Sequence, residues 1–139
     1  MNAEEYLEQV AVQNKRVKRM REKLRMLREA LGIKGVSYES IGAGKGSPNP
    51  GRIEEAYDKV IAYEQEVKEA EAQLAILRYD VEQLIQNLTD DTEREALERE
   101  FLMFQSIKQI CEEMFYSKSR LYKIRRNALE KIVVPVVQD

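Results

Sequence analysis

The sequence contains no histidine, no tryptophan and only one cysteine, Cys111. The absence of histidine removes the usual general base, the commonest metal ligand and the Glu-x-x-His signature of di-iron helix bundles. A single thiol cannot build a disulfide framework, so an intracellular setting is favoured. Cys111 falls on the inner face of an expected helix, a position typical of a small core residue rather than a nucleophile. The sequence therefore predicts no enzyme, with no catalytic residue, no metal and no cofactor.

Proline, aromatic residues and long apolar runs are also scarce. The chain has 3 prolines and 7% aromatic residues, whereas 35% of its 139 residues are charged. No stretch approaches the roughly 20 apolar residues of a membrane span, and the acidic first ten residues lack the apolar segment of a signal peptide. The composition favours long helices over a β-sandwich. It predicts a cytoplasmic protein with no membrane partner.

The net charge of -2 hides a strong sorting of charge along the chain. Residues 14–29 hold eight Lys or Arg against two Glu, a net charge of +6, and residues 53–87 hold nine acidic against three basic residues, a net charge of -6. Residues 90–100 are acidic at -4, and residues 106–132 are basic at +4. Such sorting calls for a structural or a functional reason.

Two long segments repeat apolar residues at alternating steps of three and four, the spacing of a heptad stripe. The first stripe is Tyr6, Val10, Gln13, Val17, Met20, Leu24, Leu27 and Leu31. The second is Ile53, Tyr57, Val60, Glu64, Val67, Glu71, Leu74, Leu77, Val81, Leu84 and Leu88. We expect two long helices that pack as an antiparallel, coiled-coil-like hairpin with opposite charge on its flanks. Because these stripes are too narrow for a full globular core, a homo-oligomer is expected, with a dimer favoured.

The basic residues of the first segment allow three interpretations. They can form the solvated flank of the hairpin, a second surface that contacts phosphates, or a helix that lies on a membrane surface. The flank is favoured. Between the two segments, residues 32–52 hold the chain's glycines and two of its three prolines. The stretch GAGKGS departs from the phosphate-binding P-loop pattern and follows no strand, so a solvated linker is favoured there.

The last third of the chain carries signals for three shorter helices. Thr89 or Asp90 can cap the first of them, with Leu97, Phe101 and Phe104 on its apolar face. Ser106 and Gln109 form a capping-box pattern for the second helix, and a break is expected at Phe115–Tyr116. Ser117 can cap the third helix. The expected inner face of the second helix is Ile107, Ile110, Cys111 and Met114, and that of the third is Leu121, Ile124, Ala128 and Ile132.

Two short helices joined by a tight turn, each with one apolar face, describe a helix-turn-helix. The first turn of the second helix is where base edges are usually met, while flanking cations contact phosphates. A basic helix face can also be merely solvated, but the capped turn and the clean inner stripe favour double-stranded DNA as the partner. The predicted contact set is Lys118, Ser119, Arg120, Tyr122, Lys123 and Arg126.

Residues 88–132 resemble the fourth conserved region of bacterial sigma factors. The corresponding stretches are TERE at 92–95, Arg99 and Phe101, SIKQICEEMFYS at 106–117, RLYKI at 120–124 and ALEKI at 128–132. The whole layout is similar to small phage and prophage proteins known as late-transcription regulators or sigma-like factors. The resemblance implies a module that docks on promoter-type DNA. The helical hairpin is then expected to be an arm that self-associates or contacts RNA polymerase.

Two departures from the sigma pattern limit what the resemblance implies. Phe115 stands where that pattern has its turn glycine, so the turn must avoid positive φ or accept strain. The region that melts promoter DNA in sigma factors has no counterpart, so activation, repression or operator binding is expected rather than initiation.

The expected organisation is a helical hairpin at 1–88 with its Gly/Pro loop at about 32–52, a helix-turn-helix domain at 89–134 and a tail at 135–139. The four valines of the final VVPVVQD are expected to cover an edge of the core. The favoured function is a sequence-specific DNA-binding transcription regulator. A small terminase-like packaging protein and a protein–protein adaptor are the alternatives.

Overall fold

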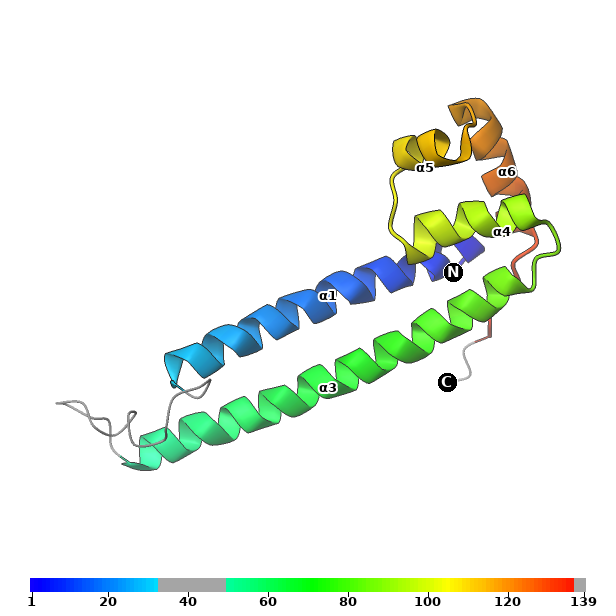
Figure 1. Cartoon of the computed structure of the whole chain (residues 1–139). Coiled ribbons are helices and arrows are strands. Elements are labelled where there is room, and N and C mark those ends of the chain that lie inside the picture. The colour runs from blue at the N-terminus through cyan, green and yellow to red at the C-terminus, as the bar shows by residue number, and fades with distance from the viewer. Residues whose placement is uncertain (33–49, 137–139) are drawn as a thin grey trace. The chain divides into compact units, whose positions relative to one another are not determined.

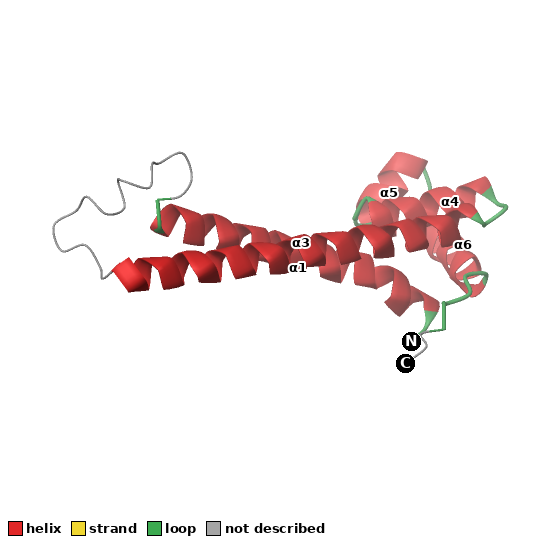
Figure 2. Ribbon diagram, turned by 90° about the horizontal axis from the view of Figure 1, so that it is seen from below, coloured by secondary structure: helices red, strands yellow, loops and turns green. Residues whose placement is uncertain are grey.

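A computed structural model describes residues 1–32 and 50–136. Its elements are α1 (Ala3–Ala30), α3 (Pro50–Gln86), α4 (Asp91–Leu97), the π-helix η1 (Glu98–Leu102), α5 (Ile107–Met114) and α6 (Lys118–Glu130) (Figure 1). The described ranges contain helices and no strand (Figure 2), which confirms the predicted all-α class with a long helix pair and smaller C-terminal helices. Most of the predicted Gly/Pro loop, residues 33–49, lies outside the described residues, and α3 already begins at Pro50.

The chain divides into two compact units. The first unit consists of Met1–Asn14 and Leu74–Asp139, so it combines the start of α1 and the end of α3 with all the shorter helices. The second unit is Lys15–Gln73, the remainder of the two long helices. The predicted division into a hairpin at 1–88 and a domain at 89–134 stays a prediction.

In the second unit α1 and α3 run antiparallel, because Arg21 pairs with Glu71 at 2.8 Å while Arg28 pairs with Glu64 at 2.9 Å. Between them lies a core of Leu24, Val60 and Val67, flanked by Met20, Leu27, Leu31 and Tyr63. The hydrogen bond from Arg28 lowers the pKa of the Glu64 carboxyl below its ordinary value. Ion pairs this exposed add little stability but help to fix register and orientation. The predicted pairing of basic and acidic helix flanks is therefore observed at two positions.

The first unit buries side chains from both ends of the chain in one core. The buried residues are Leu7, Val10, Val81, Ile85, Leu88, Leu97, Phe101, Leu102, Ala128 and Ile132. Leu7 and Ile85 are fully buried although neither belongs to the predicted heptad stripes. The stripes predict one neighbour for each long helix, whereas here the two helix ends also pack against α4, η1 and α6, which widens their buried faces.

The expected third helix is realised as two elements. Asp90 caps α4, its carboxylate accepting hydrogen bonds from the backbone N–H groups of Thr92 at 2.8 Å and Glu93 at 3.1 Å. After Leu97 the helix changes from α to the wider π-helical turn η1. The hydrogen bond from Met103 N to Glu98 O at 2.9 Å closes its end.

Predicted apolar contacts fail at two places in this unit. Phe104 was expected on the inner face but is exposed, with a positive φ of 57°, because the chain turns out of η1 one residue earlier. At the C-terminus the four valines were expected to cover an edge of the core, yet Val133 and Val136 are exposed, Val134 is half-buried and Val137 lies outside the described residues. Ile132 is the last residue of the core, and residues 137–139 lie outside the described part of the chain.

Candidate nucleic-acid interface

Helix α5 begins with the capping box that the sequence predicts. The backbone N–H of Gln109 donates to Ser106 Oγ at 3.2 Å, and Ser106 N donates to Gln109 Oε1 at 2.9 Å. Each bond satisfies a backbone donor that the helix start would otherwise leave without a partner. The side chain of Ser117 accepts from Arg120 N at 3.2 Å and caps α6 in the same way. Both short helices therefore have fixed starting points.

The turn between α5 and α6 comprises Phe115, Tyr116 and Ser117. Phe115 lies in the left-handed region at φ 60° and ψ 41°, which answers the question raised by the missing glycine: the turn accepts positive φ. The backbone N–H of Tyr116 donates to Cys111 O at 3.1 Å and closes the turn. The Phe115 side chain is 92% exposed, so no burial offsets the cost of this conformation.

Replacing Phe115 by glycine is expected to raise the free energy of unfolding by about 0.5–1 kcal/mol, because glycine adopts positive φ without a Cβ clash. Phe115→Ala is the matched control, since alanine removes the ring but keeps the clash. Urea unfolding of the three proteins measures the difference. A glycine variant no more stable than the alanine variant would contradict this assignment of strain.

The inner side of α6 holds the helix against two groups of neighbours. Leu121 packs with Ala96 and Ile110, and the partly buried Ile107, Cys111, Met114 and Ile124 surround them. About two and three turns after Leu121, Ala128 and Ile132 join the larger core of this unit. The predicted inner faces of α5 and α6 are therefore confirmed, and the opposite side of α6 is left outward.

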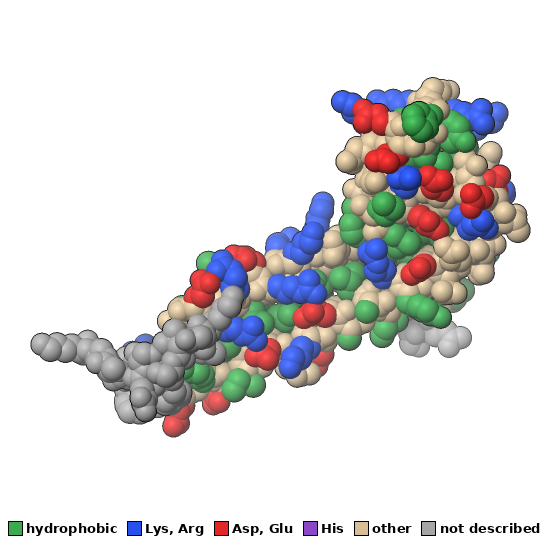
Figure 3. Space-filling model, viewed as in Figure 1, with side chains coloured by type: hydrophobic (Ala, Val, Ile, Leu, Met, Phe, Trp, Pro, Cys, Tyr) green, Lys and Arg blue, Asp and Glu red, His purple; other side chains and the backbone are tan. Residues whose placement is uncertain are grey.

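All six predicted contact residues are exposed on α6. Within the described part of the chain, Lys118, Lys123 and Arg126 form no ion pair, and the Arg120 guanidinium lies 4.7 Å from the centre of the Tyr116 ring. Figure 3 shows Lys and Arg atoms gathered along the edge formed by α5 and α6. The basic charge of this segment is thus concentrated on a surface open to a large anion.

The structure divides the predicted residues between two open hollows. Ser119, Arg120 and Lys123 line one of about 470 Å³, together with Ser117, Ile124 and Asn127. Tyr122 and Arg126 line another, of about 450 Å³, where Glu4 and Glu130 add negative charge. Lys118 lines neither of these two. Asn127 was missed by the sequence analysis, although its place four residues after Lys123 puts it on the same helix face.

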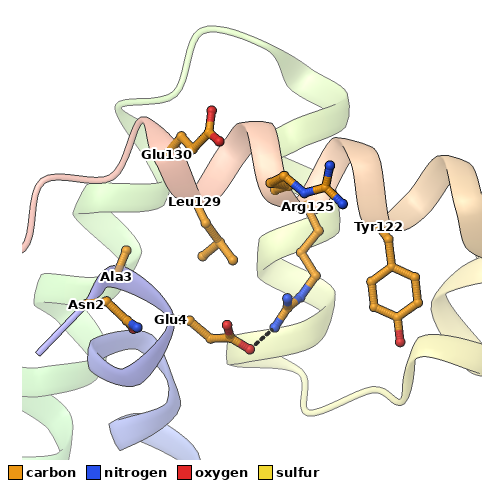
Figure 4. A pocket seen from close by; sticks show the side chains of 8 residues that line it. Asn2, Ala3, Glu4, Tyr122, Arg125, Leu129 and Glu130 are labelled. Atoms are coloured by element: carbon orange, nitrogen blue, oxygen red, sulfur yellow. Dashed lines mark hydrogen bonds and ion pairs between the residues drawn. The ribbon is translucent and has the colours of Figure 1, made fainter.

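Arg125 differs from its basic neighbours because it forms ion pairs with carboxylates of the protein itself. Its Nε donates to Glu100 Oε1 at 2.6 Å and its terminal nitrogen to Glu100 Oε2 at 2.9 Å. The same nitrogen donates to Glu4 Oε1 at 2.5 Å (Figure 4). The hydrogen bonds that it donates to Glu100 and, to a smaller extent, to Glu4 raise the pKa of the Arg125 guanidinium above its ordinary value. This residue anchors α6 to η1 and to the first turn of α1.

A second ion pair fixes the end of α6. The carboxylate of Glu93 on α4 is buried, and the ammonium of Lys131 donates to both of its oxygens, to Oε2 at 3.0 Å. This hydrogen bond raises the pKa of Lys131. Two of the seven basic residues in 106–132 are therefore structural, and the other five form no ion pair within the described part of the chain.

None of the described helices has a stretch both long and apolar enough to cross a membrane. A family model described as "Protein of unknown function (DUF1492)" matches residues 48–133, from just before α3 to just after α6. No curated protein and no solved structure matches the chain. Since the family model covers more than half of the sequence, the chain belongs to the DUF1492 family.

Proposed function

We propose that this protein is a sequence-specific DNA-binding transcription regulator of the phage or prophage type. The proposed reading head is α5–turn–α6, with α6 in the major groove, as in helix-turn-helix proteins. The long helices serve self-association or contact with RNA polymerase. The observation that carries the proposal is that Lys118, Lys123 and Arg126 are exposed on α6 and form no ion pair among the described residues. Arg125 within the same helix and Lys131 just after it are, by contrast, paired with carboxylates of the protein.

The contrast between paired and unpaired cations in this segment fits DNA binding better than an adaptor role. An adaptor gains nothing from keeping Lys118, Lys123 and Arg126 free of the protein's many carboxylates. Phosphate contacts, by contrast, need cations whose counterions can be released when DNA binds. Ser119 and Asn127 add side chains that can donate and accept hydrogen bonds at base edges. Cations would thus give affinity, and the polar side chains between them would give specificity.

Salt dependence of DNA binding tests the proposal. Lys123→Ala and Arg126→Ala are each expected to reduce the slope of log affinity against log salt by about 0.9, because each removes one phosphate contact. The matched control is Lys59→Ala, which removes an exposed lysine of α3 and is expected to leave the slope unchanged. Fluorescence anisotropy with a labelled duplex at several salt concentrations measures the slopes.

The outcomes separate the proposal from its rivals. Failure of micromolar protein to bind any duplex at low salt would refute DNA binding and favour the adaptor. Equal slopes for the α6 variants and the control would place the DNA contact elsewhere. Selection of bound sequences from a random duplex pool tests specificity, and an unselective pool would favour a packaging role.

A further inference from the structure

The second unit has charged side chains that take part in none of its ion pairs. Among its described residues, Lys15, Arg16, Lys18 and Arg19 on α1 are exposed and form no ion pair. Glu22, which follows Arg19 by three residues, is already engaged, since it pairs with Arg25. We call these four residues the cationic cluster.

The same unit has a matching excess of acid on α3. Arg21 and Arg28 neutralise Glu71 and Glu64, and Lys59 approaches Glu55 at 3.9 Å. Four further carboxylates are exposed without an ion pair among the described residues, and we call them the acidic cluster: Glu54, Asp58, Glu66 and Glu69. One unit therefore presents two surfaces of equal and opposite charge.

The two clusters lie at different levels along the helix pair. Because Arg21 meets Glu71 and Arg28 meets Glu64, residues whose numbers add up to about 92 lie side by side. Glu66 and Glu69 are thus level with residues 26 and 23 of α1, and Glu54 and Asp58 lie further from the cationic cluster. The centres of the two clusters are about 20 Å apart at 1.5 Å per residue. Among the described residues, no ion pair joins one cluster to the other within the chain.

We propose that the second unit binds a second copy of this chain through these clusters, in an antiparallel arrangement related by a two-fold axis perpendicular to the helices. A two-fold axis makes an interface self-complementary, so a contact between the cationic cluster of one copy and the acidic cluster of the other occurs twice. A parallel arrangement would keep the clusters at different levels and lose both contacts. The inference specifies, and rests on, the self-association named in the proposed function.

Apolar side chains on the same outward faces supply contact area. Met26 on α1 is 58% exposed and Ile61 on α3 is 63% exposed. Met26 lines an open, largely apolar hollow of about 500 Å³ together with Arg19, Glu22, Lys23, Leu27 and Ala30. Charged groups around an apolar patch set orientation and partner choice, while the patch contributes burial.

Paired charge reversals test the inference without DNA. Lys15→Glu/Arg19→Glu reverses two of the four charges of the cationic cluster and brings its net charge from +4 to 0. Asp58→Lys/Glu69→Lys does the same to the acidic cluster, from -4 to 0. Each variant alone is expected to self-associate at least about tenfold more weakly than the unmodified protein, because both contacts then join a charged cluster to one of net charge 0 and lose their attraction. An equimolar mixture of the two variants is expected to associate again, since a mixed dimer joins the unmodified acidic cluster of one variant to the unmodified cationic cluster of the other. Analytical ultracentrifugation measures both effects.

The matched control is Lys118→Glu/Lys123→Glu, which makes the same change of charge on α6 and is expected to leave self-association unchanged while DNA binding is lost. Raising the salt from about 0.1 M to about 1 M, which shortens the screening length from roughly 10 Å to roughly 3 Å, is expected to weaken association of the unmodified protein. A monomeric unmodified protein, or charge-reversed variants that associate normally, would overturn the inference. Failure of the mixture to associate would overturn it too. DNA titrations of the unmodified protein report separately on the proposed function, so the two can fail independently.

Discussion

Arg125→Ala is expected to lower the free energy of unfolding by about 3 kcal/mol, because it leaves two carboxylates without their shared cation. The side chain of Arg125 is 16% exposed and that of Glu100 is 18% exposed, so water compensates only in part for the lost hydrogen bonds. The arginine also stacks over Phe101, with 5.7 Å between its guanidinium carbon and the ring centre. Truncation removes this packing together with the charge.

The neighbouring residue provides the matched control for this variant. Arg126→Ala removes the same charge one position later, from an exposed side chain with no ion pair in the described part of the chain. Its stability is expected to stay within about 0.5 kcal/mol of the unmodified protein. Arg125→Lys is expected to recover only part of the loss, because an ammonium cannot present the planar fork that binds Glu100 through two nitrogens. Urea unfolding followed by circular dichroism compares the three. Equal losses of stability for Arg125→Ala and Arg126→Ala would show that the ion pairs of Arg125 with Glu100 and Glu4 do not stabilise the protein.

Leu121→Ala is expected to cost about 2–5 kcal/mol, the range for removing a fully packed leucine side chain. Leu121 is 1% exposed and touches the centre of the small core that joins α5 to α6. The larger core of the first unit does not include it, so the loss falls on the helix-turn-helix. We therefore expect weaker DNA binding at temperatures where the rest of the protein is still helical.

Ile76→Ala is the control for this truncation, because Ile76 is an aliphatic residue with its side chain 62% exposed. Its stability is expected to change by less than about 0.5 kcal/mol. Thermal unfolding monitored by circular dichroism, alongside anisotropy with a labelled duplex, separates the effect on the fold from the effect on binding. Unchanged DNA affinity in a destabilised Leu121→Ala protein would show that the packing of α5 on α6 does not position the reading surface.

The features that sequence reasoning predicted well are those decided by neighbours along the chain. The caps at Asp90, Ser106 and Ser117 depend on hydrogen bonds that reach two or three residues, so the residue types alone indicate them. The inner residues Leu121 and Ala128 follow from helical spacing in the same manner. Local chemistry is sufficient in these cases.

The features that sequence reasoning missed depend on distant partners. Arg125 looks like any other cation in its basic stretch, and only folding brings it to Glu4, which is 121 positions away. In the sequence, Glu93 resembles its acidic neighbours, which are expected to be solvated. Its burial is explained only by the ion pair with Lys131, 38 positions later. The π-helical turn at η1 has no residue signature of its own, so helical spacing predicts one continuous α-helix there.

The way the first unit is assembled has a consequence for any attempt to transplant the reading helix. Residues 89–136 alone would bring Phe101 and Ala128 but leave Leu7, Val10 and Ile85 behind. A hybrid gene that exchanges only this stretch between relatives would pack α6 against residues of α1 and α3 from another protein. Arg125 would then lose its ion pair with Glu4. A working chimera has to inherit the opening turns of α1 and the final turns of α3 from the same parent.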